Sequence, residues 1–209
     1  MLTSRAARRK WGPPLTRRFY QGDVLRVARA LIGCVLVREE AGGVTAGRIV
    51  EVEAYGGERD PASHARSGRT ARNAVMFERG GHAYVYFTYG MHYCLNVVTG
   101  EVGDASAVLI RALQPLAGIE RMRRRRGVTE LARLARGPGC VGQALALDRR
   151  HDGLDLTRSR LWIGGRRGGA VLPIARSPRI GIRRAQARRW RFFVPDSPYV
   201  SGPRRRVER

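Results

Sequence analysis

Apolar positions recur with helical spacing near the start of the chain. Over residues 23–32 they lie on one face, with Asp23 placed to cap the N-terminus and Gly33 to end the helix. A second helix is predicted to open at Pro115 and to run into the arginines at 121 and 123–126. A third, short helix is predicted over residues 141–147, after a break at Gly137-Pro138-Gly139.

Short apolar or alternating segments predict strands over residues 34–38, 45–55, 83–86, 93–98, 105–113, 161–163, 170–172 and 190–194. The strands cluster and helices do not alternate regularly with them, which favours an α+β fold around an antiparallel or mixed sheet. No linker or repeat divides the chain, so one domain is expected over residues 16–202. Residues 1–15 and 203–209 lack apolar periodicity, and we expect a flexible basic arm and a basic tail there.

Charge narrows the class of partner. The 209 residues are 43% hydrophobic, enough for a sizeable core, and carry a formal net charge of +23. Such a charge favours polyanions, either nucleic acid or an anionic membrane. No apolar stretch approaches the roughly 20 residues of a membrane span, and the N-terminus lacks the apolar region of a secretory signal. A membrane span is therefore excluded, and charge alone leaves nucleic acid or an anionic membrane surface as the expected partner.

The reactive residue types exclude several chemistries. Three widely spaced cysteines do not form a disulfide framework or a zinc ribbon, and they fit an intracellular setting. Nucleotide-binding glycine loops, the HExxH motif and the zinc-deaminase pattern are all missing, so no cofactor and no metal is expected. Lys10 is the single lysine, which leaves no lysine in the predicted core for Schiff-base chemistry.

The predicted strand over residues 45–55 carries two acids. Strand alternation places Val50, Val52 and Ala54 toward a core, and Glu51, Glu53 and Tyr55 on the other face. One interpretation is a solvated face whose acids pair with arginines across the sheet. The other is a carboxylate at the floor of a polyanion-binding cleft, where it would act as a general base.

Aromatic and basic residues gather elsewhere. The segment 84–93 holds five aromatic residues, of which Tyr84 and Tyr86 share a strand face; they fit either a sheet core or a surface that stacks bases and wedges open a duplex. Arg111 lies in an apolar strand and needs an anionic partner, which is Glu53, a phosphate or both. His64 lies in a polar loop of about twenty residues, a length that is usually functional or disordered.

Several motifs together identify a family. The segments RIVEVEAY, DPASH, RTARN, YVYFTYGMHYCLN and AVLIRALQP, in this order and spacing, resemble the alkyladenine (3-methyladenine) DNA glycosylases, and the resemblance spans residues 18–201. It implies a single domain built on a curved, mainly antiparallel sheet flanked by helices. It also implies hydrolysis of the N-glycosidic bond of alkylated purines flipped out of double-stranded DNA, which leaves an abasic site.

The resemblance also implies residue roles. Glu53 matches the catalytic acid that deprotonates the attacking water, Arg111 the arginine that holds this water, and Val194 the residue whose backbone carbonyl contacts it. The remaining matches are Tyr55, His64 and Tyr86 as walls of the base pocket, Tyr89 as the intercalating wedge, and Asn96 as the residue that excludes guanine. The chain departs from the family at His92, where an aromatic or hydrophobic residue is expected, and at Cys140, where lysine is usual.

Some expectations stay open at this stage. With no core lysine, the enzyme is expected to be a monofunctional glycosylase without lyase activity, and to act as a monomer. The run Arg123–Arg126 is either a solvated surface or a source of extra DNA affinity, measurable as salt dependence. Composition alone would also fit a basic nucleic-acid-binding module without catalysis, or a family member that binds lesions but has lost turnover.

Overall fold

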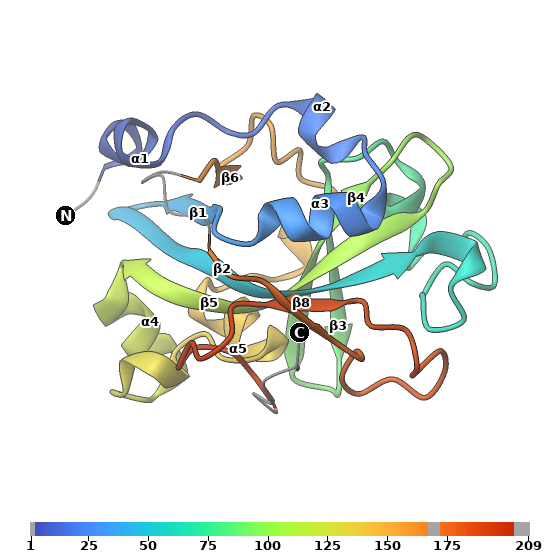
Figure 1. Ribbon diagram of the computed structural model, residues 1–209. Coiled ribbons are helices and arrows are strands. Elements are labelled where there is room, and N and C mark those ends of the chain that lie inside the picture. Colours follow the sequence, from blue (N-terminus) through green and yellow to red (C-terminus); the bar gives the residue numbers. More distant parts are fainter. Residues whose placement is uncertain (1–2, 167–171, 203–209) are drawn as a thin grey trace.

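An antiparallel sheet forms the centre of the molecule. The computed structural model describes residues 3–166 and 172–202. Its sheet has the order β3-β4-β5-β2-β1-β6, and β8 pairs with β2 on one side and with β7 on the other. The long strands β2 and β5 run side by side across the whole molecule (Figure 1). The strands are β1 (Val35–Glu40), β2 (Gly43–Gly56), β3 (Ala83–Thr88), β4 (His92–Thr99), β5 (Ser106–Ala117), β6 (Leu161–Gly164), β7 (Ala175–Ser177) and β8 (Arg191–Phe193).

Helices lie on both sides of this sheet (Figure 1). They are α1 (Ser4–Trp11), α2 (Arg17–Tyr20), α3 (Val24–Leu31), α4 (Ile119–Arg126) and α5 (Pro138–Ala144), with 3₁₀ turns at Gly57–Arg59, Ala74–Phe77, Leu131–Arg133 and Arg149–His151. The side chain of Asp23 caps α3 by accepting hydrogen bonds from the backbone N–H groups of Leu25 and Arg26. A single domain with a mostly antiparallel sheet confirms the predicted α+β class. None of the helices in the described part of the chain has the length and hydropathy of a membrane-spanning helix.

An irregularity in β2 sets the geometry of the site. The β2–β5 register shifts on both sides of Glu51, so that Glu51 pairs with Ala112 and Val52 pairs with Ile110. Simple alternation predicts that Val50 lies with Val52 and Ala54. The structure instead buries Val52 and Ala54 in the main core, whereas Val50 packs in a separate cluster with Ala112.

The N-terminal segment differs from the expected flexible arm. Residues 4–11 form α1, which Thr3 caps through its hydroxyl oxygen. Ala7 and Trp11 are buried in a cluster with Trp162 of β6, so apolar residues four positions apart anchor this short, very basic helix. Four apolar or small residues among many arginines were too few to reveal the pattern. The predicted tail, 203–209, lies outside the described residues.

Two element boundaries and one strand of the structure also differ from the prediction. Pro115 does not open a helix: it belongs to the end of β5, opposite Gly47 at a register shift, where a missing N–H is tolerated. Gly137-Pro138-Gly139 begins α5 rather than only ending the preceding segment, since Pro138 takes the first helical position. The strand β7 was not predicted, and the strand predicted over 170–172 lies largely outside the described residues.

Candidate active site

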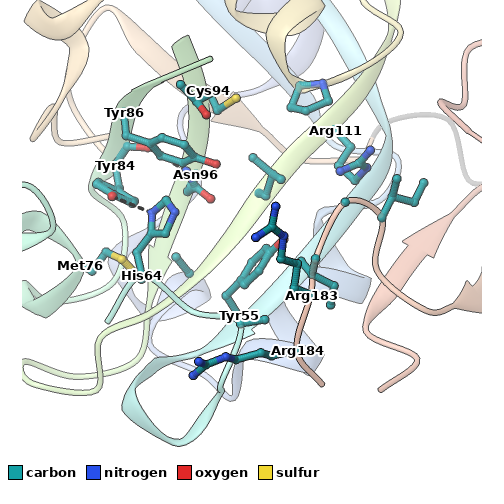
Figure 2. Close-up of a pocket in the computed structure, with 18 of the residues that line it drawn as sticks. Tyr55, His64, Met76, Tyr84, Tyr86, Cys94, Asn96, Arg111, Arg183 and Arg184 are labelled. Carbon is teal, nitrogen blue, oxygen red and sulfur yellow. Dashed lines mark hydrogen bonds between the residues drawn. The ribbon is translucent and has the colours of Figure 1, made fainter. Parts of the chain in front are cut away.

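A cavity of about 520 Å³ opens beside the β3–β4 hairpin. Strands β2 to β5 supply nine of its twenty lining residues. The others are Tyr89 at the hairpin tip, Pro138 of α5, four residues between β2 and β3, and five residues of the segment joining β7 to β8, residues 178–190, here called the strap. In Figure 2, Tyr86 and His64 lie on one side and Tyr55 on the other. The cavity brings together six residues predicted from the sequence, namely Tyr55, His64, Tyr86, Tyr89, Asn96 and Arg111.

Glu53 lies buried behind this cavity with every oxygen engaged. Its side chain has no exposed surface. Oε2 accepts hydrogen bonds from the Tyr55 hydroxyl at 2.9 Å and from Nη1 of Arg111 at 3.2 Å, and Oε1 accepts one from the Ile180 backbone N–H at 2.7 Å. Glu51 is equally buried. The interpretation of these acids as a solvated strand face is therefore wrong, although their pairing with arginine is present.

Arg111 joins the two acids. Its Nε donates to Glu51 at 3.1 Å while Nη1 donates to Glu53, and the guanidinium is almost fully buried. Burial by itself would lower the pKa of Arg111, but Glu53 and Glu51 more than offset it, so the pKa lies above its ordinary value. A permanently charged, planar donor is thus held at the boundary between the carboxylates and the cavity.

The aromatic wall is built from β3 and the loop after β2. The Nδ1 atom of His64 lies 3.0 Å from the Tyr84 hydroxyl, and the His64 ring meets Tyr86 edge-on at 4.6 Å. Burial in the wall, assisted by the positive charge of Arg72, lowers the pKa of His64. The imidazole is therefore neutral at pH 7. Asn96 lies beneath these rings and donates to the backbone carbonyl of Tyr84 at 3.2 Å.

The tip of the β3–β4 hairpin carries exposed apolar side chains. Tyr89 is 82% exposed and adopts a left-handed backbone conformation, with φ of 51°. Gly90 follows with φ of 67°. Among the described residues, three of the four exposed large hydrophobic side chains belong to this hairpin, namely Phe87, Tyr89 and Met91. Such a patch marks an interaction surface rather than a solvated turn.

The strap supplies interactions that the sequence analysis missed. Arg179 is buried, forms two hydrogen bonds with Asp60, and places its guanidinium 4.7 Å from the centre of the Tyr55 ring. The next residue, Ile180, then reaches Glu53 with its N–H. The sequence SPRIGI by itself predicts no such role. The available signal was Arg179 beside Ile180, an arginine in an apolar context like that of Arg111.

Val194, which the resemblance matches to a residue that contacts the water through its backbone carbonyl, directly follows β8. Its backbone N–H donates to the carbonyl of Val50 at 2.9 Å, and its side chain packs against the cluster that contains Val200. It is not among the residues that line the cavity. The backbone that meets Glu53 is that of Ile180 in the strap.

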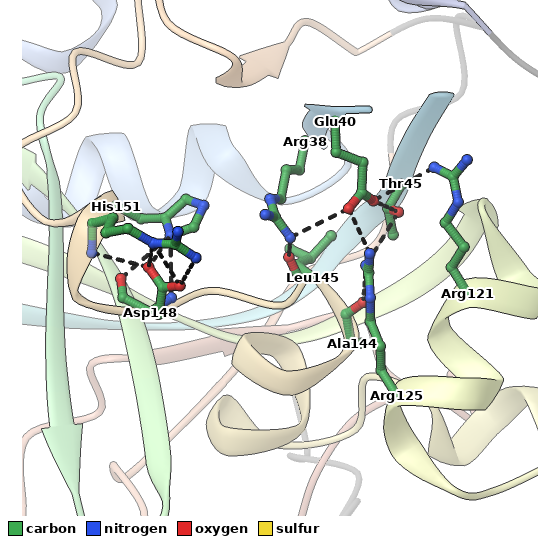
Figure 3. A network of polar contacts seen from close by, with 10 residues as sticks. Arg38, Glu40, Thr45, Arg121, Arg125, Ala144, Leu145, Asp148 and His151 are labelled. Atoms are coloured by element: carbon green, nitrogen blue, oxygen red, sulfur yellow. Dashed lines mark hydrogen bonds and ion pairs between the residues drawn. The ribbon is translucent and has the colours of Figure 1, made fainter. Parts of the chain in front are cut away.

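Most arginines of the run 123–126 on α4 form hydrogen bonds with other groups of the protein. Arg125 donates to Glu40 and to the carbonyl of Ala144, as Figure 3 shows. Arg123 contacts Glu120 and a backbone carbonyl, and Arg126 contacts the side chain of Gln143. Arg124 is exposed. Three of the four arginines therefore contact other groups of the protein, and whether the run adds DNA affinity stays a prediction.

The two departures from the family pattern lie on neighbouring elements. A Cβ atom at Gly139 would lie 2.8 Å from Cγ of His92, so the His92 ring packs directly on the first turn of α5. Cys140 follows in the same turn and is partly exposed. Within residues 3–166 and 172–202, no group of three or more His, Cys, Asp or Glu side chains is arranged to hold a metal ion.

Together these features define a class of protein. A buried carboxylate held by arginine lies beside an aromatic cavity large enough to admit a nucleobase, next to an exposed apolar hairpin on a strongly basic chain. This arrangement is typical of an enzyme that acts on nucleic acid. The chain belongs to the methylpurine-DNA glycosylase family, whose model matches residues 18–198.

Relatives agree with this assignment. The chain is 49% identical over 188 residues to a protein of Carboxydothermus hydrogenoformans, covering 90% of this chain and 98% of the relative. It is 50% identical over 192 residues to one of Rhodopseudomonas palustris (strain HaA2), covering 92% of each. Both carry the name "Putative 3-methyladenine DNA glycosylase". The protein is thus a DNA glycosylase for alkylated bases in DNA repair, and its substrate is DNA.

Proposed function

We propose that the enzyme flips an alkylated purine out of duplex DNA into the 520 Å³ cavity and hydrolyses its N-glycosidic bond with water activated by Glu53. The observation that carries this proposal is the placement of Glu53, a fully buried carboxylate fixed by Tyr55, Arg111 and the Ile180 N–H directly behind the cavity. The product is DNA with an abasic site and a free base.

The reaction needs a carboxylate near the sugar, which acts as the general base. As the C1′–N bond breaks, its electron pair leaves with the purine and positive charge develops on the sugar, which an adjacent carboxylate stabilises. Water adds to C1′ and its proton passes to Glu53. Arg111 faces both the carboxylate and the cavity, so its guanidinium can hold the water in line with C1′. A base alkylated at N3 or N7 is cationic and leaves as a neutral molecule, so one carboxylate suffices.

The cavity selects the base by stacking. Tyr55 and Tyr86 present rings to a flipped base, and the neutral edge of His64 lies beside them. A cationic base gains roughly 0.5–2 kcal/mol from such aromatic faces. Asn96 crowds the purine edge where guanine carries its 2-amino group. Neutral lesions would need a proton on the leaving base, and we expect them to be poorer substrates.

The surface around the cavity fits a DNA duplex. Tyr89 fills the space vacated by the flipped nucleotide, which offsets an unstacking cost of a few kcal/mol. Arg183 and Arg184 of the strap are exposed at the cavity (Figure 2), where they meet the phosphates beside that nucleotide. We further propose that the enzyme acts as a monomer.

The enzyme is also proposed to be monofunctional. The chain's single lysine, Lys10, lies on α1 with its ammonium group over the Trp11 ring, and it does not line the cavity. No lysine amine is therefore available to form a Schiff base with the abasic sugar.

One assay tests both the glycosylase mechanism and the absence of lyase activity. Methylated duplex DNA is incubated with excess enzyme, released bases are separated by chromatography, and the DNA is divided into samples with and without alkaline treatment. We expect free 3-methyladenine, strand breaks only after alkali, and no enzyme–DNA adduct with borohydride. Absence of base release would contradict the glycosylase mechanism, whereas an adduct trapped by borohydride would contradict only its monofunctional form.

A further inference from the structure

The proposed reaction leaves one buried acid without a role. Glu51 lies two residues before Glu53 on the same face of β2 and has no exposed surface. The irregular β2–β5 pairing at Glu51 places Arg111 between the two acids, where its guanidinium reaches both. A second arginine, Arg191 of β8, donates its Nε to the same Glu51 oxygen at 2.6 Å.

Both carboxylate oxygens of Glu51 accept hydrogen bonds. Its second oxygen accepts the Ser201 backbone N–H at 2.6 Å. Arg191 is fixed in turn, since Nη1 donates to the Ser177 hydroxyl at 2.9 Å, Nη2 donates to the Ser201 carbonyl at 2.8 Å, and its guanidinium lies 4.2 Å from the Phe193 ring centre. Three separate chain segments therefore converge on this carboxylate, which, like Glu53, is not among the residues that line the cavity.

Because the guanidinium is planar, the contact with Glu51 fixes the orientation of the Arg111 side chain. The five N–H donors of a guanidinium form a rigid fork, so fixing Nε fixes where both terminal nitrogens point. Glu51 holds the Nε edge of Arg111 at 3.1 Å, which leaves Nη1 aimed at Glu53 at 3.2 Å. The weak Nη2 contact to the Ser201 hydroxyl, at 3.4 Å, cannot set this orientation alone.

Charge supports the same role. The group contains two acids and two arginines, all nearly inaccessible to solvent, so it is neutral as a whole. Loss of the Glu51 charge would leave two buried guanidinium groups facing Glu53 alone. Arg111 would then be drawn toward Glu53, away from the pose in which it can also hold a water.

We propose that Glu51 is a positioning residue of the glycosylase reaction, which orients Arg111 against Glu53 and balances the charge of the buried group. This inference rests on the proposed function of Glu53 and Arg111. Glu51 touches neither DNA nor water in the reaction, and acts only through the guanidinium of Arg111.

Two substitutions separate the geometric part from the charge part. Glu51→Asp keeps the charge but withdraws the carboxylate by one carbon–carbon bond, about 1.5 Å. Glu51→Gln keeps the length but removes the charge and turns an N–H₂ group toward surrounding N–H donors. We expect single-turnover base release to fall by about 100-fold in either variant, as for a misplacement of about 1 Å. Affinity for lesion DNA stays within about twofold, because the cavity wall is unchanged.

The pH profile gives a readout that a purely structural residue would not move. The charged and titratable groups around Glu53 are Glu51 and Tyr55 on β2, Arg111 on β5, Arg191 on β8, and Arg179 of the strap with its partner Asp60. Glu51→Gln removes a charge from the buried group, whereas Glu51→Asp keeps it, so we expect the pH profile of the rate to change in Glu51→Gln and to stay as in the wild type in Glu51→Asp.

Glu40 provides the matched control. It is also a glutamate held by arginine, accepting from Arg125 with Arg38 and Arg121 nearby, but it lies on β1 and does not line the cavity (Figure 3). Glu40→Gln is expected to lower the melting temperature without changing the rate of base release or its pH profile.

The outcomes are distinct. A wild-type enzyme that releases no base would overturn the proposed function, and this inference with it. A wild-type enzyme that releases base, beside Glu51→Asp and Glu51→Gln variants with the same rate per folded molecule, would overturn the positioning role alone. If Glu51→Gln does not fold, Glu51→Asp decides: a rate within about twofold of the wild type would contradict the role.

Discussion

The Tyr55 hydroxyl donates a hydrogen bond of 2.9 Å to Glu53, two residues earlier on the same strand. One wall of the cavity is thereby bonded to the carboxylate that we propose as the group that activates water. Burial, reinforced by the negative charge of Glu53, raises the pKa of Tyr55 well above its ordinary value, so the hydroxyl remains a donor throughout the working pH range.

Replacement of Tyr55 by phenylalanine tests this coupling. The ring is retained, so affinity for lesion DNA should be unchanged, whereas single-turnover base release should fall about 10-fold through loss of one hydrogen bond to a charged group. Single-turnover kinetics and equilibrium binding measure the two effects separately. Equal losses of rate and affinity would mean that the hydroxyl serves binding rather than catalysis.

The hairpin tip is expected to be a wedge. Tyr89→Ala removes a side chain that is 82% exposed, so the unfolding free energy should be unchanged, while excision from duplex DNA should fall by about 10-fold or more because unstacking is no longer offset. Val102→Ala, at an exposed apolar residue of another turn, is the control and should have no effect. Excision by Tyr89→Ala at the wild-type rate would contradict the proposed role of Tyr89 as the intercalating wedge.

The strap arginines should bind DNA phosphates. Replacement of Arg183 or Arg184 by serine is expected to reduce the slope of log affinity against log salt by about one unit for each phosphate that the variant no longer neutralises. Arg124→Ser, at an exposed arginine of α4, is the control and should leave the slope unchanged. Binding isotherms across a salt series measure it. If the slope falls in the control but not in the strap variants, α4 rather than the strap contacts the DNA phosphates.

The Asp60–Arg179 pair should secure the strap against acid. Burial alone would raise the pKa of Asp60, but its bonds with Arg179 bring it below the ordinary value. The pair therefore contributes stability above pH ~3.9, which is lost as the pH falls through the folded-state value.

Removal of the Asp60 charge is expected to lower the unfolding free energy. Asp60→Asn leaves Arg179 buried without its anion, and we expect the unfolding free energy at pH 7 to fall by about 3–5 kcal/mol. The difference from the wild type should narrow in denaturant titrations carried out at progressively lower pH. A gap that is constant from pH 7 to pH 3 would show that the pair is not what holds the strap.

Local patterns were sufficient for much of the fold. The cap at Asp23 and the strand patterns over 45–55, 83–86 and 93–98 identified their elements, because each has its own hydrophobic periodicity. The helix at residues 4–11 was missed, since two buried residues among many arginines give no clear face. Pro115 was misplaced because the register shift that admits a proline depends on the partner strand.

The site was predictable where the chemistry itself was unusual. Arginine in an apolar strand required an anion, and Arg111 indeed pairs with Glu53. The role of Ile180 could not be found in the same way, because its contribution is a backbone N–H that any residue type supplies. Val194 was assigned by resemblance alone, and the contact of its backbone carbonyl with the water stays a prediction.

The most direct test of the account is single-turnover excision from methylated duplex DNA by the wild-type enzyme and by Glu53→Gln, with lesion affinity measured in parallel. Glutamine keeps the shape of the side chain but cannot take a proton from water. The account predicts base release by the wild type, none by Glu53→Gln, and similar affinity for both. Base release by Glu53→Gln at the wild-type rate would contradict it.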